Sequence, residues 1–524
     1  HFGPNIVVQG SMEFLADETL VASLALLQVE DLFQLGQTSR RLLALAGSDL
    51  VWLPATLARW RFGALPSVGE ALSPGDRDAA SLSALAETLR SPLSRGVEAF
   101  RCFVGRYKQD VRVVILLLQI LVAQTGQTVK RAGICHPGAV VMLQSAAHRG
   151  KTGVVTRWQS GDDFAVIIAS LKAESMQQLK VNSQSLTLLE TAVSTKEAEQ
   201  ALLQMGAEAI DALVTLTKMT GTGTDPFLRS LSAAASRVLA TTMEHWAVAQ
   251  WRLLRQDPSR IDLFEEGGLV VALWSDPEAV DVKRVRGLLS TLVDAVARQT
   301  PEEASLIQRV NAVSDVLFRD FGFGGNSDDY YNPRNSFLHH VLEQRRGIPI
   351  SLSIVWAAVA RRMNVPCFLC AQFPRHIVIR VPTGAGNFMD DIYVDAFGQK
   401  VMDYRGLVSF GISIGLPAVP EEYVAVCPPT AIYARLLRNL ISIFSQNFAE
   451  DAVQPNSLRT PRLPRLIGAI SQFIAVADPA AADQVQELTR TRTALRERHD
   501  AVRFLDASSL HALTASLHTE PLAR

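Results

Sequence analysis

Apolar residues recur every three or four positions in most of the chain, which is the spacing of helices that bury one face. This pattern runs through residues 11–62, returns at 80–130 and at 195–320, and continues through the C-terminal segment 428–524. A polar stretch with Pro, Ser and Gly at 66–75 separates the first two helical segments. The pattern therefore predicts four helical segments, with a linker after the first.

Between residues 133 and 190 the apolar spacing changes to that of strands. Short apolar runs, separated by turns that contain Gly, lie at 139–143, 153–156, 164–168 and 179–181. Short strands in this order predict a small β-barrel, similar to the Src-homology-three kind. Gly153 suits a bulge or a point where two strands approach closely. The sequence leaves open whether such a barrel binds a peptide or acts as a spacer.

Length and charge balance exclude several classes of protein. A chain of 524 residues is expected to form about three to five domains. It is 48% hydrophobic and 20% charged, with a net charge of −1. Nucleic-acid and membrane-surface partners call for a positive field, so neither is expected. The longest apolar stretch, 113–123, is shorter than the roughly 20 residues that span a bilayer and predicts a buried helix.

The five cysteines are few and scattered, which favours reduced thiols in the cytoplasm and/or the nucleus over a disulfide framework. Cys367 and Cys370 have CxxC spacing, but no second Cys or His pair lies at metal-ligand spacing. We therefore expect no metal site and no cofactor, and we expect the two cysteines to be small, semi-buried residues of a strand.

The N-terminal helical segment resembles an F-box. The resemblance rests on four pieces, at 15–20, 29–32, 37–42 and 49–53, although Leu15-Ala16 stands where that family usually has Leu-Pro. It implies a three-helix domain that docks on the Skp-family linker of a cullin ubiquitin ligase, by the recognition of apolar anchors in a groove. The candidate anchors are Leu20, Leu24, Leu32 and Leu35. The alternative is that these leucines form the core of the bundle itself.

A second resemblance rests on five motifs that occur in order. They are FGFGGN at 321–326, DYYNPRNS at 329–336, VLEQRRGIPISLS at 341–353, FPRH at 373–376 and VDAFG at 394–398. Together they resemble the SirB-type transglutaminase-like family, which also forms the central part of the F-box only protein 21 group. The resemblance implies a papain- or transglutaminase-like α+β core at 321–425. It also implies a helical lead-in at 195–320 and a tetratricopeptide-like tail at 428–524.

The residues of the core predict where catalysis would take place. Pro349 suits the first turn of an apolar helix, and a helix N-terminus stabilises a nucleophilic thiolate. His376 opens one strand-like run and Asp395 ends another, which is the layout of a Cys-His-Asp triad. No cysteine lies within 346–363, however, and the residue in the place of the nucleophile is Pro349 or Ser351. Ser351, His376 and Asp395 are therefore candidates for a vestigial triad.

Four further residues are candidates for lining the cleft: Tyr330, Tyr331, Asn335 and Arg375. The two tyrosines lie in a polar, aromatic turn and either contact a ligand or pack against the core. Arg375 stands where the family usually has a glycine, so we expect its side chain to narrow the cleft.

These patterns predict a multidomain α+β protein that is not an enzyme. The main hypothesis is a substrate-recognition adaptor of an Skp–cullin–F-box ubiquitin ligase, whose inactive transglutaminase-like domain binds a protein substrate that the sequence does not reveal. One alternative is a hydrolase or acyl transferase that uses Ser351, His376 and Asp395. Another is a scaffold protein with no role in ubiquitin ligation.

Overall fold

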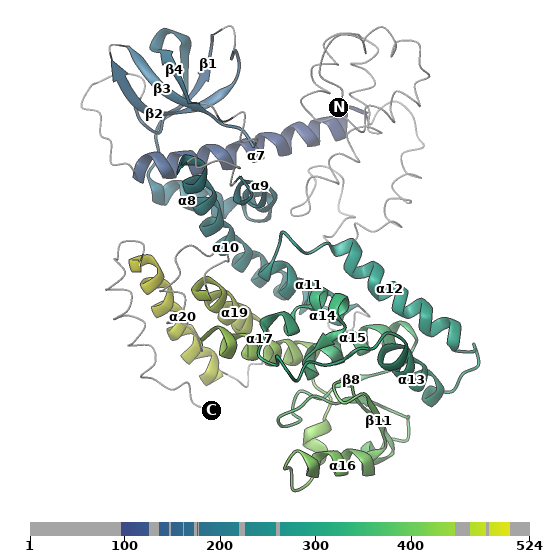
Figure 1. Cartoon of the computed structure of the whole chain (residues 1–524). Helices are drawn as coiled ribbons and strands as arrows, with labels where there is room; N and C mark the ends of the chain where they lie inside the picture. Colours follow the sequence, from purple (N-terminus) through teal and green to yellow (C-terminus); the bar gives the residue numbers. More distant parts are fainter. Residues whose placement is uncertain are drawn as a thin grey trace, which may run out of the picture. The chain divides into compact units, whose positions relative to one another are not determined.

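A computed structural model gives the fold (Figure 1). It describes residues 96–124, 136–145, 148–160, 162–171, 176, 178–219, 226–257, 262–445, 462–477 and 482–502. The F-box-like segment 11–62, with Leu20, Leu24, Leu32 and Leu35, lies outside the described residues. The chain divides into two compact units, His1–Thr242 and Met243–Arg524, which are described separately.

The first unit contains a five-stranded antiparallel sheet. Its strands are β1 (Val140–Leu143), β2 (Thr152–Ser160), β3 (Asp163–Ile168), β4 (Gln178–Asn182) and β5 (Leu186–Glu190), in the order β4-β3-β2-β1-β5. The first four lie where the apolar runs predicted strands, and β5 follows a short 3-10 turn that the sequence pattern did not reveal. A Cβ on Gly153 would lie 2.7 Å from the carbonyl oxygen of Ile167, which confirms the predicted close approach of strands.

Helices pack with this sheet in the first unit: α7 (Gly96–Gln124), α8 (Thr195–Met205), α9 (Ala207–Thr217) and the first part of α10 (Pro226–Leu254). The apolar run of α7 is buried, as predicted, and packs against α8, α9 and β2. Gln119 interrupts this run for a structural reason, because its buried side chain donates to the carbonyl of Gly138 at 2.9 Å. No helix in the described ranges is long and apolar enough to cross a bilayer.

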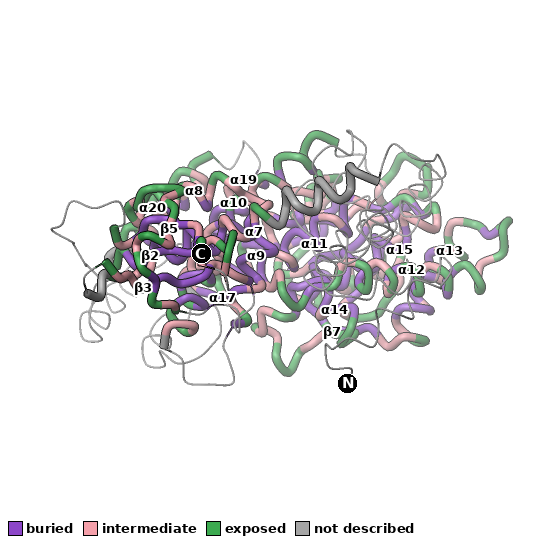
Figure 2. The backbone as a smooth tube through the Cα atoms, turned by 90° about the horizontal axis from the view of Figure 1, so that it is seen from above, coloured by how far each residue is buried: buried purple, intermediate pink, exposed green. Residues whose placement is uncertain are grey.

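The second unit is built around one buried helix. Its helices include α11 (Leu263–Ser275), α12 (Val282–Gln299), α13 (Leu306–Asp315), α14 (Leu338–Gln344) and α15 (Pro349–Arg362). Helix α15 begins at the predicted proline, and its first twelve residues are all buried. It contacts α11, α12, α13 and α14, and Figure 2 shows its tube in the colour of buried residues. Such all-round burial explains why its sequence is almost continuously apolar.

A small antiparallel sheet follows α15 and carries half of the candidate site. Its strands, in the order β11-β10-β9-β8, are β8 (Phe368–Leu369), β9 (Ile379–Val381), β10 (Ile392–Asp395) and β11 (Lys400–Met402). Helix α16 (Tyr404–Ser413) comes next and lies with this sheet in the lower part of Figure 1. Strand β9 begins at Ile379, so His376 lies in the loop before it rather than at its first residue.

The described part of the second unit also contains α17 (Pro429–Ser445), α19 (Arg462–Val476) and α20 (Ala482–Val502). The apolar face predicted for the first of these is buried. On α17 the hydroxyl of Tyr433 donates to the carbonyl of Phe264 on α11. On α19 the Gln472 side chain accepts a hydrogen bond of 2.9 Å from the Trp251 indole of α10. The described part is thus multidomain and α+β, as expected, while the barrel, F-box and tetratricopeptide assignments stay predictions.

Candidate functional site

The start of α15 is held by hydrogen bonds to Ser351. The backbone N–H of Ile348 donates to Ser351 Oγ at 3.1 Å, and Ser351 Oγ donates to the carbonyl of Asn335 at 2.5 Å. A Cβ on Gly347 would lie 2.6 Å from Ser351 Oγ, so a glycine is needed there. A hydroxyl has a single proton to donate. The Ser351 side chain, which is only 3% exposed, therefore acts as a helix cap in this structure.

Asn335 connects this cap to the polar, aromatic turn that precedes it. Its side-chain amide donates to the carbonyls of Asp329 at 2.6 Å and Tyr330 at 3.1 Å. Its side-chain oxygen accepts a hydrogen bond of 3.0 Å from Asn326. The residue is 2% exposed, so the structure makes Asn335 a brace of the turn and not a lining residue of the cleft, in contrast to our prediction.

His376 and Asp395 form a hydrogen-bonded pair, as the sequence predicted. Nε2 of His376 lies 2.8 Å from Oδ1 of Asp395. The same carboxylate oxygen accepts the backbone N–H groups of Phe397 and Gly398, each at 3.0 Å. A carboxylate only accepts hydrogen bonds, so Nε2 of His376 donates to Asp395. No hydrogen bond of Nδ1 is present in the described part of the chain, and His376 is only partly buried.

Aromatic rings extend from this pair in two directions. The His376 ring meets Phe410 of α16 edge to face at 5.0 Å and Phe397 at 6.0 Å. Phe397 in turn contacts Tyr330 at 6.3 Å, and Tyr330 contacts Tyr331 at 5.3 Å. Tyr331 is 69% exposed, so this series of aromatic contacts ends at the protein surface. The structure thus links the two predicted tyrosines to the His–Asp pair through Phe397, which the sequence analysis missed.

The comparisons with known proteins agree with this geometry. Residues 283–438 match the family model of the transglutaminase-like superfamily. A UPF0162 protein from Xylella fastidiosa (strain 9a5c) is 30% identical over 224 residues, which cover 42% of this chain and 76% of that protein. This chain belongs to the same transglutaminase-like family as the UPF0162 proteins. The resemblance inferred from the five sequence motifs is therefore confirmed.

Similarity to a second group of relatives in this family is more limited in extent. F-box only protein 21 from Homo sapiens is 27% identical over 190 residues, which cover 32% of this chain and 30% of that protein. The protein of the same name from Pongo abelii is 28% identical over the same length. The chain thus matches less than a third of F-box only protein 21. No solved structure gave a significant match.

Arg375 shows how this member of the family accommodates a bulky residue beside the histidine. Its φ of +59° lies in the left-handed region that favours glycine, which fits the glycine usual at this position. Its guanidinium lies 3.4 Å from the carbonyl of Ile414, at the C-terminal end of α16. Carbonyl groups at a helix C-terminus attract a cation, which offsets part of the backbone cost of about 1 kcal/mol. The Arg375 side chain thus reaches toward α16.

A second arginine holds the same loop and had no signal in the sequence. Arg435 of α17 donates from Nη1 to the carbonyls of Ala371 at 2.8 Å and Phe373 at 2.6 Å. Both carbonyls lie just before His376 in the chain. Burial lowers the pKa of the Arg435 guanidinium. Arg435 of α17 and Arg375 of the loop itself, whose side chain reaches the C-terminal end of α16, therefore anchor the loop that presents the histidine.

The cysteines of the second unit lie away from the start of α15, and burial keeps their thiols protonated. Burial raises the pKa of Cys367 and of Cys370 to about 12, and these two residues flank β8, beyond the C-terminal end of α15. Burial also raises the pKa of Cys427, whose thiol donates to the carbonyl of Leu369 at 3.1 Å. A protonated thiol is a poor nucleophile and a poor metal ligand. No cluster of metal-binding side chains occurs among the described residues.

Proposed function

We propose that this chain is a substrate-recognition adaptor of an Skp–cullin–F-box ubiquitin ligase, and that its transglutaminase-like core binds protein without catalysing acyl transfer. The observation that carries the second half is the pairing of Ser351, whose hydroxyl caps α15 and donates to the carbonyl of Asn335. The first half rests on the F-box pattern at 11–62 and on the similarity to F-box only protein 21.

The geometry of the core argues against a serine nucleophile. A catalytic serine donates its hydroxyl proton to a base that lies about 2.6–3.2 Å away. Here that proton goes to a backbone carbonyl, and within the described ranges the ring nitrogens of His376 have a hydrogen bond to Asp395 alone. An unactivated hydroxyl is also a much weaker nucleophile than a thiolate. The His–Asp pair then serves as a structural element beneath a binding surface.

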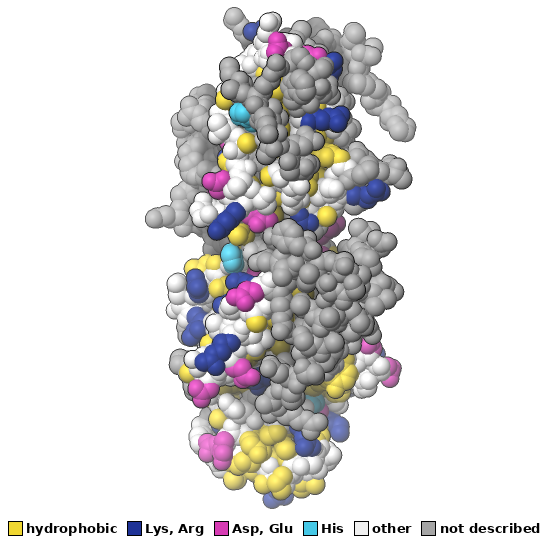
Figure 3. All heavy atoms as spheres, turned by 90° about the vertical axis from the view of Figure 1, so that its left-hand side faces the viewer, with side chains coloured by type: hydrophobic (Ala, Val, Ile, Leu, Met, Phe, Trp, Pro, Cys, Tyr) yellow, Lys and Arg dark blue, Asp and Glu magenta, His cyan; other side chains and the backbone are white. Residues whose placement is uncertain are grey.

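The surface of the second unit suits a binding role. Ile412 of α16 is 60% exposed, and Figure 3 shows hydrophobic side chains gathered at the lower end of the molecule, where Figure 1 places α16. Exposed apolar patches commonly mark protein-binding sites. In this proposal the Skp-family protein and the cullin bind the F-box-like segment, and the ubiquitylated substrate binds the second unit. The complex acts in the cytoplasm or the nucleus, where thiols stay reduced.

Co-purification with a Skp-family protein tests the adaptor role. The wild-type chain is expected to bind, and Leu32→Asp is expected to abolish binding because it places a charge among the predicted apolar anchors. Ile412→Asp is the matched control, since it places the same charge on an exposed apolar residue of α16 and should leave binding intact. Failure of the wild type to bind, or binding by Leu32→Asp, contradicts the adaptor role.

Labelling with a fluorophosphonate tests the non-catalytic half of the proposal. The His376–Asp395 pair is the feature that favours a hydrolase, so the reactivity of Ser351 has to be measured directly. We expect no labelling of the wild-type chain, because the Ser351 hydroxyl is buried and already paired. Labelling that disappears in both Ser351→Ala and His376→Ala contradicts the non-catalytic reading and favours the hydrolase.

A further inference from the structure

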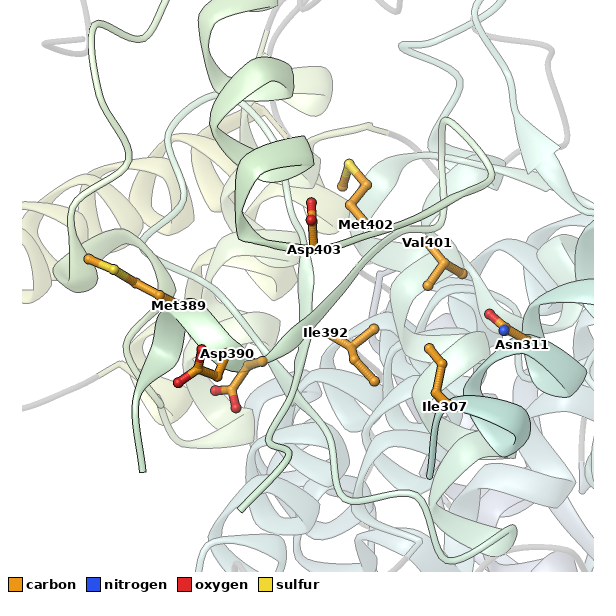
Figure 4. Close-up of a pocket in the computed structure, with 9 residues that line it drawn as sticks. Ile307, Asn311, Met389, Asp390, Ile392, Val401, Met402 and Asp403 are labelled. Atoms are coloured by element: carbon orange, nitrogen blue, oxygen red, sulfur yellow. The ribbon is translucent and has the colours of Figure 1, made fainter. Parts of the chain in front are cut away.

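A pocket in the second unit lies away from the His–Asp pair. It has a volume of about 470 Å³ and lies between α13, the 3-10 turn η5 (Phe388–Asp390), β10 and β11 (Figure 4). Ile392 of β10 lines it. Side chains alternate between the two faces of a strand, so Tyr393 and Asp395 face the other side of β10 from Ile392. The pocket therefore lies on the opposite face of β10 from the His–Asp pair.

Two exposed apolar side chains line the pocket. Among the described residues only seven large hydrophobic side chains are exposed, and two of these, Ile307 at 43% and Met389 at 50%, line this one pocket. Figure 4 shows Ile307 and Val401 on one side and Met389 on the other, with Ile392 between them. Methionine is flexible and adapts to ligands of different shapes. These features favour a site that an apolar group enters.

The charged residues that line the pocket are all acidic. Its lining contains Asp390, Asp391 and Asp403 and no Lys, Arg or His. Asp391 is neutralised by Arg380, whose Nε donates to it at 2.6 Å, and Asp403 accepts the backbone N–H of Gly406 at the start of α16. Asp390 is exposed, and no ion pair or hydrogen bond of its carboxylate is present in the described part of the chain. The pocket thus retains negative charge beside its apolar surface.

We propose that this pocket binds a segment of the ubiquitylation substrate in which a Lys or Arg side chain lies next to an apolar side chain. This inference rests on the proposed adaptor function. The cationic head pairs with Asp390, and its aliphatic stem lies along Met389 and Ile307. The neighbouring apolar side chain enters between Ile392 and Val401. Charge complementarity decides between occupants, because an acidic segment meets repulsion from the carboxylates.

A defined probe tests this inference. The probe is a fluorescein-labelled synthetic peptide that alternates Lys and Leu, with two control peptides in which Glu replaces Lys or Ser replaces Leu. Anisotropy of the full-length protein should show binding of the Lys-Leu peptide and about tenfold weaker binding of each control peptide. Asp390→Asn and Met389→Ser should each weaken binding of the Lys-Leu peptide by about tenfold.

Matched variants outside the pocket make the test specific. Asp328→Asn removes an exposed carboxylate elsewhere in the same unit, and Leu253→Ser removes an apolar side chain that is 54% exposed. Both should bind the probe like the wild type. In protein labelled with ¹³C at the methionine methyls, the Met389 resonance should shift on addition of the peptide. No binding, equal weakening by pocket and control variants, or an unmoved Met389 resonance overturns the inference.

The same variants separate this inference from the adaptor function. Asp390→Asn and Met389→Ser should retain binding to the Skp-family protein, because they do not change the F-box-like segment. If the wild-type chain binds the Skp-family protein but does not bind the Lys-Leu peptide, the inference about the pocket is wrong and the adaptor role still stands. Peptide binding by a wild-type chain that does not bind a Skp-family protein overturns the adaptor role and removes the reason to assign the peptide to a ubiquitylation substrate.

Discussion

The two halves of the candidate site differ in how completely their polar groups are hydrogen-bonded. In the sheet half, one oxygen of Asp395 accepts hydrogen bonds from His376, Phe397 and Gly398. In the helix half, formed by residues 333–353, Ser351 is fully paired. Close to it, however, the described structure shows buried polar atoms without a protein partner: Ser336 Oγ, Ser353 Oγ and both ring nitrogens of His339.

This difference fits the proposal that the core has a catalytic layout but does not catalyse acyl transfer. The His–Asp pair is tied into the β10 turn by hydrogen bonds, so it contributes to stability whether or not a nucleophile is present. The start of α15 has a different requirement, because its first N–H groups need acceptors. A serine satisfies that requirement and uses its proton on Asn335. The presence of the His–Asp hydrogen bond in the sheet half therefore does not show that Ser351 in the helix half acts as a nucleophile.

The largest expected effect comes from breaking the sheet half. Asp395→Ala removes three hydrogen bonds and leaves two backbone N–H groups of the β10 turn without their acceptor. At about 1 kcal/mol for each lost bond, the free energy of unfolding should fall by about 3 kcal/mol. Urea unfolding measures this loss. Asp390→Ala removes an exposed aspartate in the 3-10 turn η5, just before the same strand, and should change stability by less than about 0.5 kcal/mol. Equal effects for the two variants would show that the Asp395 network is not stabilising.

The sequence predicted the elements of both halves of the site well. Pro349 at the start of α15, Asp395 at the end of β10 and the buried face of α17 all depend on local spacing, which propensity and periodicity reveal. The boundary before β9 was less accurate, because the residues between His376 and Ile379 are apolar without being in the strand.

The side-chain contacts of the site could not be predicted in this way. Ser351 reaches Asn335 across sixteen positions of sequence, and Arg435 reaches Phe373 across sixty-two. Phe410 meets the His376 ring only because α16 folds back over the small sheet. Such contacts depend on tertiary packing, which a single sequence does not display. Asn335 was for this reason assigned to the cleft when it braces a turn.

A decrease in pH should break the helix half selectively. Burial lowers the pKa of His339 from 6.5 to about 4, with a contribution from neighbouring His340; Asp276 opposes this shift and Arg334 adds to it. Between these values the unfolded chain binds the proton and the folded chain does not, so stability falls as pH falls from about 6.5 toward 4. The loss should reach about 2 kcal/mol after allowance for screening.

Urea unfolding at several pH values measures this loss. His339→Phe is the test variant, because its ring can stack on Phe337 as the imidazole does and it cannot titrate. It should remove most of the decrease between about pH 6.5 and 4. His340→Phe is the control, since burial also lowers the pKa of His340 but the residue is less buried, and it should leave most of the decrease in place. If the His339→Phe curve matches that of the wild type, the decrease comes from other groups.

Two serines on the same helix differ in their hydrogen bonding. Ser351 and Ser353 are both buried near the start of α15, but only the Ser351 hydroxyl has hydrogen-bond partners in the described structure. Ser351→Ala leaves the N–H of Ile348 and the carbonyl of Asn335 unpaired, so at about 1 kcal/mol for each lost bond the free energy of unfolding should fall by about 2 kcal/mol. Ser353→Ala removes a buried hydroxyl that has no protein partner, and stability should stay within about 0.5 kcal/mol of the wild type or rise. Urea unfolding of both variants decides the matter: a larger loss in Ser353→Ala than in Ser351→Ala would contradict the assignment of Ser351 as the cap of α15.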